Sequence, residues 1–208
     1  MNLSDPKTNL TSDETIRSVL IHELSLLHSN DTKVRIIEEF GVKHGSARID
    51  IAVVNGIMHG YEIKSDKDTL NRLPEQMEVY NTIFDRVTLI VGKKHVIEAI
   101  NLVPDWWGIS IAKFDIQTNK LIFNCIREAY ENPQKNCLSI ARLLWREEAL
   151  QILEEIGYAS GLRSKPRNAL YERLSQTLDQ KTLSDKVRER IFFRQDWRAD
   201  SPLVLNDD

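Results

Sequence analysis

Two carboxylates and a lysine flank a short turn in the sequence, and together they could bind a divalent cation. Asp50 lies in one apolar run, Glu62 and Lys64 lie in the next, and Asn-Gly at positions 55–56 separates the two runs. An Asn-Gly pair between apolar runs is the strongest short-range signal for a β-hairpin. Ionisable groups in a buried hairpin are costly unless something charged lies among them. A cation held by both carboxylates, with the lysine beside it, would satisfy all three groups.

The register of this hairpin decides whether the two carboxylates meet. Strand side chains alternate between faces, so a slip of one residue moves a side chain to the other face. A two-residue loop sets Asp50 opposite Tyr61 and turns Glu62 away. A three-residue loop, Asn55–Ile57, pairs Asp50 with Glu62 instead. We therefore predict the three-residue loop, or a bulge near His59-Gly60, where glycine tolerates the backbone angles that a bulge needs.

A further acid could come from the strand that precedes this hairpin, predicted over Val34–Val42. If the following loop, residues 43–46, is four residues long, Glu39 pairs with Asp50 and joins the same face. A loop shifted by one residue selects Glu38 instead. We prefer Glu39.

The first predicted helix offers another acid. It runs from about Thr11 to His28, and Thr11 and Glu14 have the spacing of a capping box. Glu23 falls on the apolar stripe of this helix, and two interpretations stay open. The carboxylate reaches water from the edge of the stripe, or it points into the charged pocket. The stripe consists of Ile16, Val19, Leu20, Leu24 and Leu27.

The following segments complete an α/β fold with a mixed sheet that helices cover. A helix that starts with Pro74 and runs to about Phe84 carries Gln76 and Tyr80 on one face, because they lie four residues apart. Taken alone, Tyr80 is a core residue. The strand 86–91 is reached through a helical crossover, so we expect it to be parallel to its neighbour. A further helix is predicted over 95–102, and strands over 109–114 and 120–126.

From Ser139 the pattern becomes helical and basic. Helices are predicted over 139–156, 166–178 and 183–193, which divides the chain into a core, 12–132, and a C-terminal extension, 138–198. The net charge is −3, but residues 157–198 carry ten Lys and Arg against five Asp and Glu. A basic tail on an acidic body suits contact with an anionic polymer. A solvated helical face and a dimerisation element, which would make a homodimer, are the alternatives.

The composition is that of a soluble, cytoplasmic protein. Hydrophobic residues make up 41% and charged residues 28% of the 208 positions, and no apolar run approaches the length of a membrane span. The N-terminus lacks the features of a signal peptide. The two cysteines do not have a metal-type spacing, and we expect reduced thiols. The five histidines show no paired ligand spacing and are interpreted as surface or turn residues, and Trp106-Trp107 as core rather than as a platform for bases.

The arrangement of these residues resembles the PD-(D/E)XK nuclease superfamily. It consists of Asp50, eleven residues, Glu62-x-Lys64, and then a helix with Gln76-x-x-x-Tyr80, which is similar to the version in RecB-type nuclease domains. The sequence around these positions also resembles an uncharacterised bacterial family within that superfamily. The resemblance covers about residues 12–112 and implies a restriction-endonuclease-like core, α-β-β-β-α-β. One departure is that Ile49, not proline, precedes Asp50.

The resemblance also implies a role for each residue of the arrangement. Asp50 and Glu62 would bind Mg²⁺ or Mn²⁺, the carbonyl of Ile63 would add a ligand, and Glu39 or Glu23 would be the additional acid. Hard cations of this kind prefer oxygen ligands. Lys64 would position or activate a water molecule and offset negative charge. Gln76 and Tyr80 would orient Lys64 and contact the nucleic-acid backbone.

The implied function is a divalent-metal-dependent endonuclease that hydrolyses phosphodiester bonds, in DNA, in a setting such as bacterial DNA repair or phage defence. The alternatives are an RNA nuclease and a non-catalytic nucleic-acid-binding or assembly protein that retains the fold. A structural ion pair between an acid and Lys64 is the simplest competing interpretation of the arrangement itself, although buried ion pairs are a poor source of stability. The basic residues expected to bind nucleic acid are Lys67, Arg72, Arg163, Lys165 and Arg167.

Overall fold

A six-stranded mixed sheet forms the centre of the chain. In the computed structural model, which describes residues 10–194, the strands lie side by side in the order of the sequence. The third, fourth and fifth strands are mutually parallel, and every other neighbouring pair is antiparallel. The predicted mixed sheet and the predicted parallel crossover are therefore confirmed. The strands are β1 (Arg35–Val42), β2 (Ala47–Val54), β3 (Met58–Lys64), β4 (Arg86–Gly92), β5 (Gly108–Phe114) and β6 (Leu121–Arg127).

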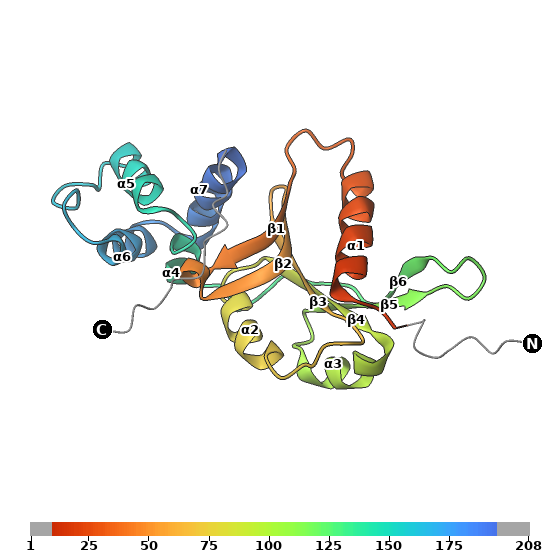
Figure 1. Cartoon of the computed structure of the whole chain (residues 1–208). Coiled ribbons are helices and arrows are strands. Elements are labelled where there is room, and N and C mark those ends of the chain that lie inside the picture. The colour runs from red at the N-terminus through yellow and green to blue at the C-terminus, as the bar shows by residue number, and fades with distance from the viewer. Residues whose placement is uncertain (1–9, 195–208) are drawn as a thin grey trace, which may run out of the picture.

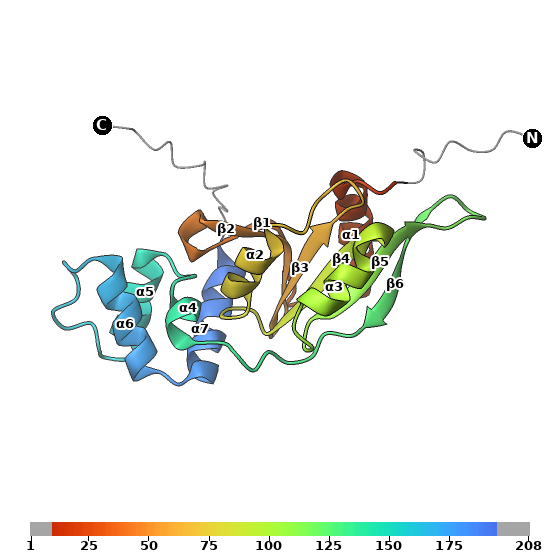
Figure 2. The same ribbon diagram turned by 90° about the horizontal axis from the view of Figure 1, so that it is seen from below.

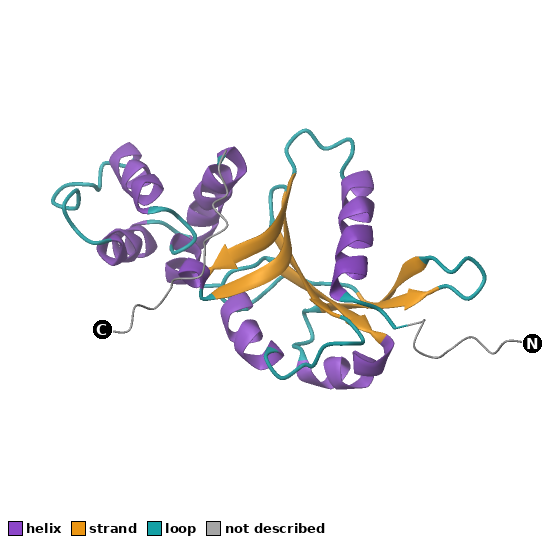
Figure 3. Cartoon of the chain, in the orientation of Figure 1, coloured by secondary structure: helices purple, strands orange, loops and turns teal. Residues whose placement is uncertain are grey.

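Helices cover both faces of the sheet. The long helix α1 (Asp13–Leu27) lies on one face, and α2 (Leu73–Tyr80) and α3 (Val96–Leu102) lie on the other (Figure 1, Figure 2). Two short 3-10 helices, η2 (Lys43–Gly45) and η3 (Lys93–His95), complete this part of the chain. Figure 3 shows the alternation of helix and strand along it. The expected order of a helix, three strands, a helix and a strand is confirmed.

The start of α1 differs from the prediction. Ser12, not Thr11, is the N-cap residue, and its side chain accepts a hydrogen bond from the Thr15 N–H. Thr11 is instead buried, and its hydroxyl donates to Asp66 Oδ2 at 2.8 Å. Ile16, Leu20 and Leu24 of the predicted stripe are buried against the sheet, but Leu27 is 73% exposed, so the stripe ends one turn early. α1 thus packs against the sheet through three turns.

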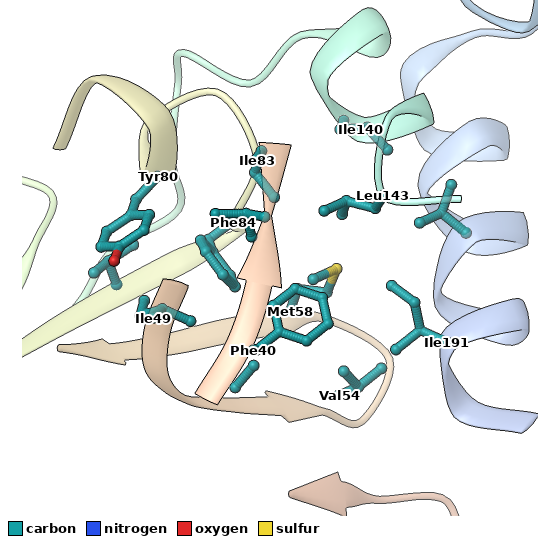
Figure 4. Packing of buried hydrophobic residues seen from close by; sticks show 14 of the residues in the cluster. Phe40, Ile49, Val54, Met58, Tyr80, Ile83, Phe84, Ile140, Leu143 and Ile191 are labelled. Carbon is teal, nitrogen blue, oxygen red and sulfur yellow. The ribbon is translucent and has the colours of Figure 1, made fainter. Parts of the chain in front are cut away.

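The C-terminal helices pack against the sheet and share its hydrophobic core. Ile140, Leu143 and Ile191 belong to the same buried cluster as Phe40 and Val54, and Figure 4 shows these side chains converging. Because apolar burial is the main stabilising term in folding, this contact joins the two parts of the chain firmly. The single predicted helix 139–156 is two helices, interrupted at residues 142–145. The helices are α4 (Cys137–Ala141), α5 (Arg146–Glu155), α6 (Arg167–Thr177) and α7 (Gln180–Phe193).

A buried carboxylate reinforces the same junction. Asp85 is 8% exposed and accepts a hydrogen bond from the Met58 N–H at 2.7 Å. Lys135 and Arg188 both form ion pairs with Asp85, the latter at 3.4 Å. Two cations and one backbone donor therefore surround one acid, which ties β3 to the segment before α4 and to α7.

The aromatic and histidine predictions have different outcomes. Trp106 and Trp107 are buried, and the Trp107 indole donates to Asn81 Oδ1 at 2.8 Å, which confirms them as core residues. His95 is not a surface residue, because it is 6% exposed, and His59 is half-buried on β3, where burial lowers its pKa to about 4. Within residues 10–194 no helix combines the length and the apolar character that crossing a bilayer would require.

Candidate metal centre

The hairpin register brings Asp50 and Glu62 to the same place in the sheet. Val54 pairs with Met58, so the loop is the predicted three-residue loop, and the ladder continues to Ile51 opposite Tyr61. Gly56 in this loop has φ +98°, a conformation that favours glycine. The same register, extended by one step beyond the last pair, aligns Asp50 with Glu62. The register on which the candidate site depends is confirmed.

The main-chain pairing between β2 and β3 ends at Ile51 and Tyr61. Beyond it, the Asp50 side chain contacts the β3 backbone. Its Oδ2 accepts a hydrogen bond from the Ile63 backbone N–H at 2.6 Å. The carboxylate thus stands where a peptide carbonyl of β2 would otherwise accept. Burial raises the pKa of Asp50, although the Ile63 N–H and the nearby Arg17 guanidinium act in the opposite direction.

Glu62 is buried and surrounded by donors. It is 1% exposed, and its Oε1 accepts from Lys64 Nζ at 2.5 Å and from Gln76 Nε2 at 2.6 Å. Burial and the neighbouring Asp50 charge raise the pKa of Glu62 to about 7, more than Lys64 lowers it. This carboxyl therefore keeps its proton to a higher pH than an exposed glutamate does.

Helix α2 supplies two of these donors from one face, as the sequence predicts. The Tyr80 hydroxyl lies 2.6 Å from the Arg48 carbonyl oxygen and 3.0 Å from Glu62 Oε2. Its single proton can serve only one of these acceptors at a time. Tyr80 is also fully buried, which confirms it as a core residue whose hydroxyl reaches Glu62. Gln76 Oε1 is buried and has no hydrogen-bond partner among the described residues.

Arg17 of α1 is a site residue that the sequence analysis missed. Its guanidinium lies 2.6 Å from Asp50 Oδ1, 3.0 Å from the Asp50 carbonyl oxygen and 2.6 Å from Glu39 Oε1. It also pairs with Asp13 at 3.2 Å, one turn earlier on the same helix. The available signal was its position directly after Ile16, at the edge of the buried stripe. A charged residue there can extend from the helix across the sheet end.

The two candidate additional acids have different positions. The β1–β2 pairing of Glu38 with Ile51 and Phe40 with Ile49 places Glu39 opposite Asp50, as predicted. The Glu39 carboxylate, however, is half-exposed and is held by Arg17. Glu23 is exposed on α1, six residues beyond Arg17, or about 9 Å along the helix axis. The interpretation that Glu23 reaches water from the edge of the stripe is therefore the correct one.

The basic residues expected to bind nucleic acid are all exposed, but they lie in two separate segments. Lys67 and Arg72 lie between β3 and α2, directly after the strand that carries Glu62. Arg163, Lys165 and Arg167 lie at the connection of α5 to α6, and Arg163 pairs with Glu154 at 3.0 Å. Only the first segment adjoins the site along the chain.

The donor set suits Mg²⁺ or Mn²⁺, which take further ligands from substrate and water. It suits less well a metal that needs all its ligands from the protein. Among the residues that the structure describes, no group of three or more His, Cys, Asp or Glu side chains could hold a metal ion. Mg²⁺ commonly uses one or two carboxylates together with substrate phosphates and water. Asp50 and Glu62 provide the two carboxylates, and the unpartnered Gln76 Oε1 could accept from a water molecule beside them. The Ile63 backbone is already in contact with Asp50 through its N–H.

Comparison with known proteins identifies relatives of the whole chain. The sequence model of a family described as Bacteriophage P4 protein cII matches residues 6–205, which include every residue of the candidate site. A curated relative, Protein cII of Enterobacteria phage P4, is 27% identical over 157 residues, or 76% of this chain and 56% of that protein. The chain therefore spans little more than half the length of that relative. No solved structure matches.

Proposed function

The chain belongs to the bacteriophage P4 protein cII family, and we propose that it is a divalent-metal-dependent nuclease that hydrolyses phosphodiester bonds in DNA. The observation that carries the proposal is the buried Glu62, which stands opposite Asp50 and is held by Lys64, Gln76 and Tyr80. This is the residue set, in the arrangement, that the resemblance to the PD-(D/E)XK superfamily implies. The restriction-endonuclease-like core is part of the same proposal.

The charge balance of the site favours this function over a structural ion pair. Lys64 pairs with Glu62, and Arg17 pairs with Asp50 but is shared with Asp13 and Glu39, the latter also paired with Arg48, so four carboxylates face three cations. Burial and then the Asp50 charge raise the pKa of Glu62 to about 7. A structural pair stabilises poorly even when its charges balance, and an excess of negative charge makes it worse. Strongly perturbed ionisable groups with named charge partners are typical of functional sites. An additional cation would relieve the excess.

The residues of the chain would divide the chemistry among them. Asp50 and Glu62 would hold Mg²⁺ or Mn²⁺, which supplies Lewis acidity toward the phosphate and a water nucleophile near neutral pH. Lys64 would orient this water and offset the negative charge that develops on the phosphoryl oxygens. Gln76 and Tyr80 would fix the Glu62 carboxylate and, through it, the Lys64 ammonium. Lys67 and Arg72 would contact phosphates of the bound strand.

The test is a cleavage assay of the full chain with Mn²⁺ on single-stranded, duplex and branched DNA and on RNA. We expect cleavage of DNA, reduced about 10²- to 10⁴-fold by Lys64→Ala and by Asp50→Ala, since positioned catalytic groups contribute factors of this size. Asp105→Ala and Lys181→Ala are the matched controls, because both side chains are exposed. Circular dichroism would verify that each variant is folded.

Each alternative function predicts a different result in this assay. Cleavage that neither site substitution affects would exclude the proposed site. Binding without cleavage on every substrate would support the non-catalytic nucleic-acid-binding protein. Cleavage of RNA alone would assign the same site to an RNA nuclease.

A further inference from the structure

All four carboxylate oxygens of the candidate site lie within hydrogen-bond distance of a protein donor. Asp50 Oδ2 accepts from the Ile63 N–H, and Glu62 accepts from the side chains of α2 and from Lys64. The remaining oxygen, Asp50 Oδ1, accepts from Arg17 Nη2 at 2.6 Å. Each of the two acids therefore has its own tethered cation, Lys64 for Glu62 and Arg17 for Asp50. A divalent cation must share or displace these contacts.

Arg17 is the donor that can leave most easily. The Ile63 N–H belongs to the sheet, and Lys64 follows Glu62 on the same strand, so both are fixed in place. Arg17 comes from a different element, and its guanidinium has two other carboxylate partners, Asp13 and Glu39. The side chains of these partners are 43% and 49% exposed, against 17% for Asp50. The guanidinium can thus release Asp50 and remain ion-paired nearer to the solvent.

We propose that Arg17 is an internal counter-ion that competes with the divalent cation for Asp50, and that Asp13 and Glu39 hold its guanidinium once the cation is bound. The inference rests on the proposed function, because it requires Asp50 to be a metal ligand. It also assigns a role to Glu39: this residue stands opposite Asp50 as the sequence predicts, but it binds the guanidinium and not the metal.

Charge and geometry both predict how substitutions of Arg17 act. Removing the guanidinium removes a competing donor and also a positive charge that repels the incoming cation. Lysine keeps the charge but lacks the planar fork that contacts the carboxylate and the carbonyl of Asp50 together. We therefore expect the affinity for Mn²⁺ to increase from the wild type through Arg17→Lys to Arg17→Gln. For R17Q the expected increase is about tenfold to a hundredfold, the factor that corresponds to about 1.4 to 2.8 kcal/mol.

The experiment is a calorimetric titration of the full chain with Mn²⁺ in the absence of nucleic acid. Arg188→Gln is the matched control, since the Arg188 side chain is 14% exposed and pairs with two aspartates, while Arg17 is 16% exposed. R188Q removes comparable ion pairs, those with Asp85 and Asp185, at a position distant in sequence from the site. It should leave the affinity for Mn²⁺ unchanged. Thermal unfolding without metal would show that each variant is folded.

The outcomes separate this inference from the function on which it rests. The order of affinities given above supports the inference, and R17K alone is sufficient if R17Q does not fold. Equal or weaker binding of Mn²⁺ by folded R17Q and R17K, with binding by the wild type, would overturn the role of Arg17 and leave the proposed function in place. No binding of Mn²⁺ by any variant would overturn the metal site itself.

Discussion

Two buried acids, Glu62 on β3 and Asp85 directly before β4, differ in how their charge is compensated. Asp85 has two cationic partners, Lys135 and Arg188, and a backbone donor. Glu62 has one cationic partner, Lys64, and a second acid beside it, Asp50, whose own cation Arg17 is shared with Asp13 and Glu39. Both acids are less than a tenth exposed. Burial alone therefore does not distinguish a structural carboxylate from one that is proposed to bind a cation.

The difference lies in the local balance of charge. An acid with enough cations and backbone donors connects parts of the structure, as Asp85 connects β3 to the C-terminal helices. An acid that lacks compensation stays partly protonated and is ready for a ligand of positive charge. We expect substitutions at the two positions to have opposite effects on stability, and this is the comparison that the following experiments test.

The largest effect on stability is expected for Asp85→Ala. This substitution leaves Lys135 and Arg188 buried without their shared partner, and breaking a buried ion pair in this way typically costs about 3–5 kcal/mol. Urea unfolding of the variant and the wild type measures the difference. Cleavage per folded molecule should stay at the wild-type level, because Asp85 is not part of the site. A loss of stability as small as that of an exposed ion pair would contradict the structural role.

Glu62→Gln should increase the stability of the metal-free chain relative to the wild type, and only above acidic pH. The folded-state pKa of Glu62 is raised from 4.5 to about 7, so the folded chain holds this proton more tightly than the unfolded chain. The wild type therefore loses up to about 3 kcal/mol of stability from this group as the pH rises from about 4.5 to about 7. The glutamine variant lacks this loss. Unfolding in metal-free buffer at pH 4.5, 6 and 8 measures it, and parallel curves for the two proteins would exclude the raised pKa.

Tyr80→Phe should have an intermediate effect that links the core to the site. The phenol is buried and lies within hydrogen-bond distance of Glu62 and the Arg48 carbonyl, and its loss removes one hydrogen bond to a buried acceptor. Such a loss costs about 1–3 kcal/mol. The pKa of Glu62 should rise further, because the Tyr80 hydrogen bond lowers it. The midpoint of the pH-dependent loss described above should accordingly move to higher pH in this variant.

The smallest effect on stability is expected for Arg163→Ala. Its pair with Glu154 is exposed, and such pairs contribute about 0–1 kcal/mol. If Arg163 contacts a phosphate, the slope of the logarithm of DNA affinity against the logarithm of salt concentration should decrease by about 1. An unchanged slope would assign this arginine to the solvated face of the helical extension.

The sequence alone predicted those parts of the site whose positions follow from the repeat of a strand or a helix. The three-residue loop aligns Asp50 with Glu62, the four-residue loop aligns Glu39 with Asp50, and the helical period brings Gln76 and Tyr80 to one face. These are local rules, in which spacing determines position. They also gave the order of the strands and helices around the site.

Contacts between elements distant in the sequence could not be predicted in this way. Arg17 reaches Asp50 because of how α1 crosses the sheet, and no spacing within α1 shows that crossing. The same holds for His95, which was assigned to the surface or a turn but is buried by its neighbours, and for His59, which is half-buried. Thr11 has the spacing of a cap, but its contact with Asp66, distant in sequence, took precedence over the local pattern.

The Asp50 side chain forms a fork in the sheet, because β2 and β3 separate where its carboxylate accepts the Ile63 N–H. Residues 47–49 on one branch pair with β1 and residues 62–64 on the other pair with β4, so each branch keeps a neighbour in the sheet. Side chains hold main-chain groups on both branches: Tyr80 donates to the Arg48 carbonyl, Arg17 donates to the Asp50 carbonyl, and the Ile63 N–H donates to Asp50. Substitution of Asp50 would therefore remove the contact that bridges the two branches.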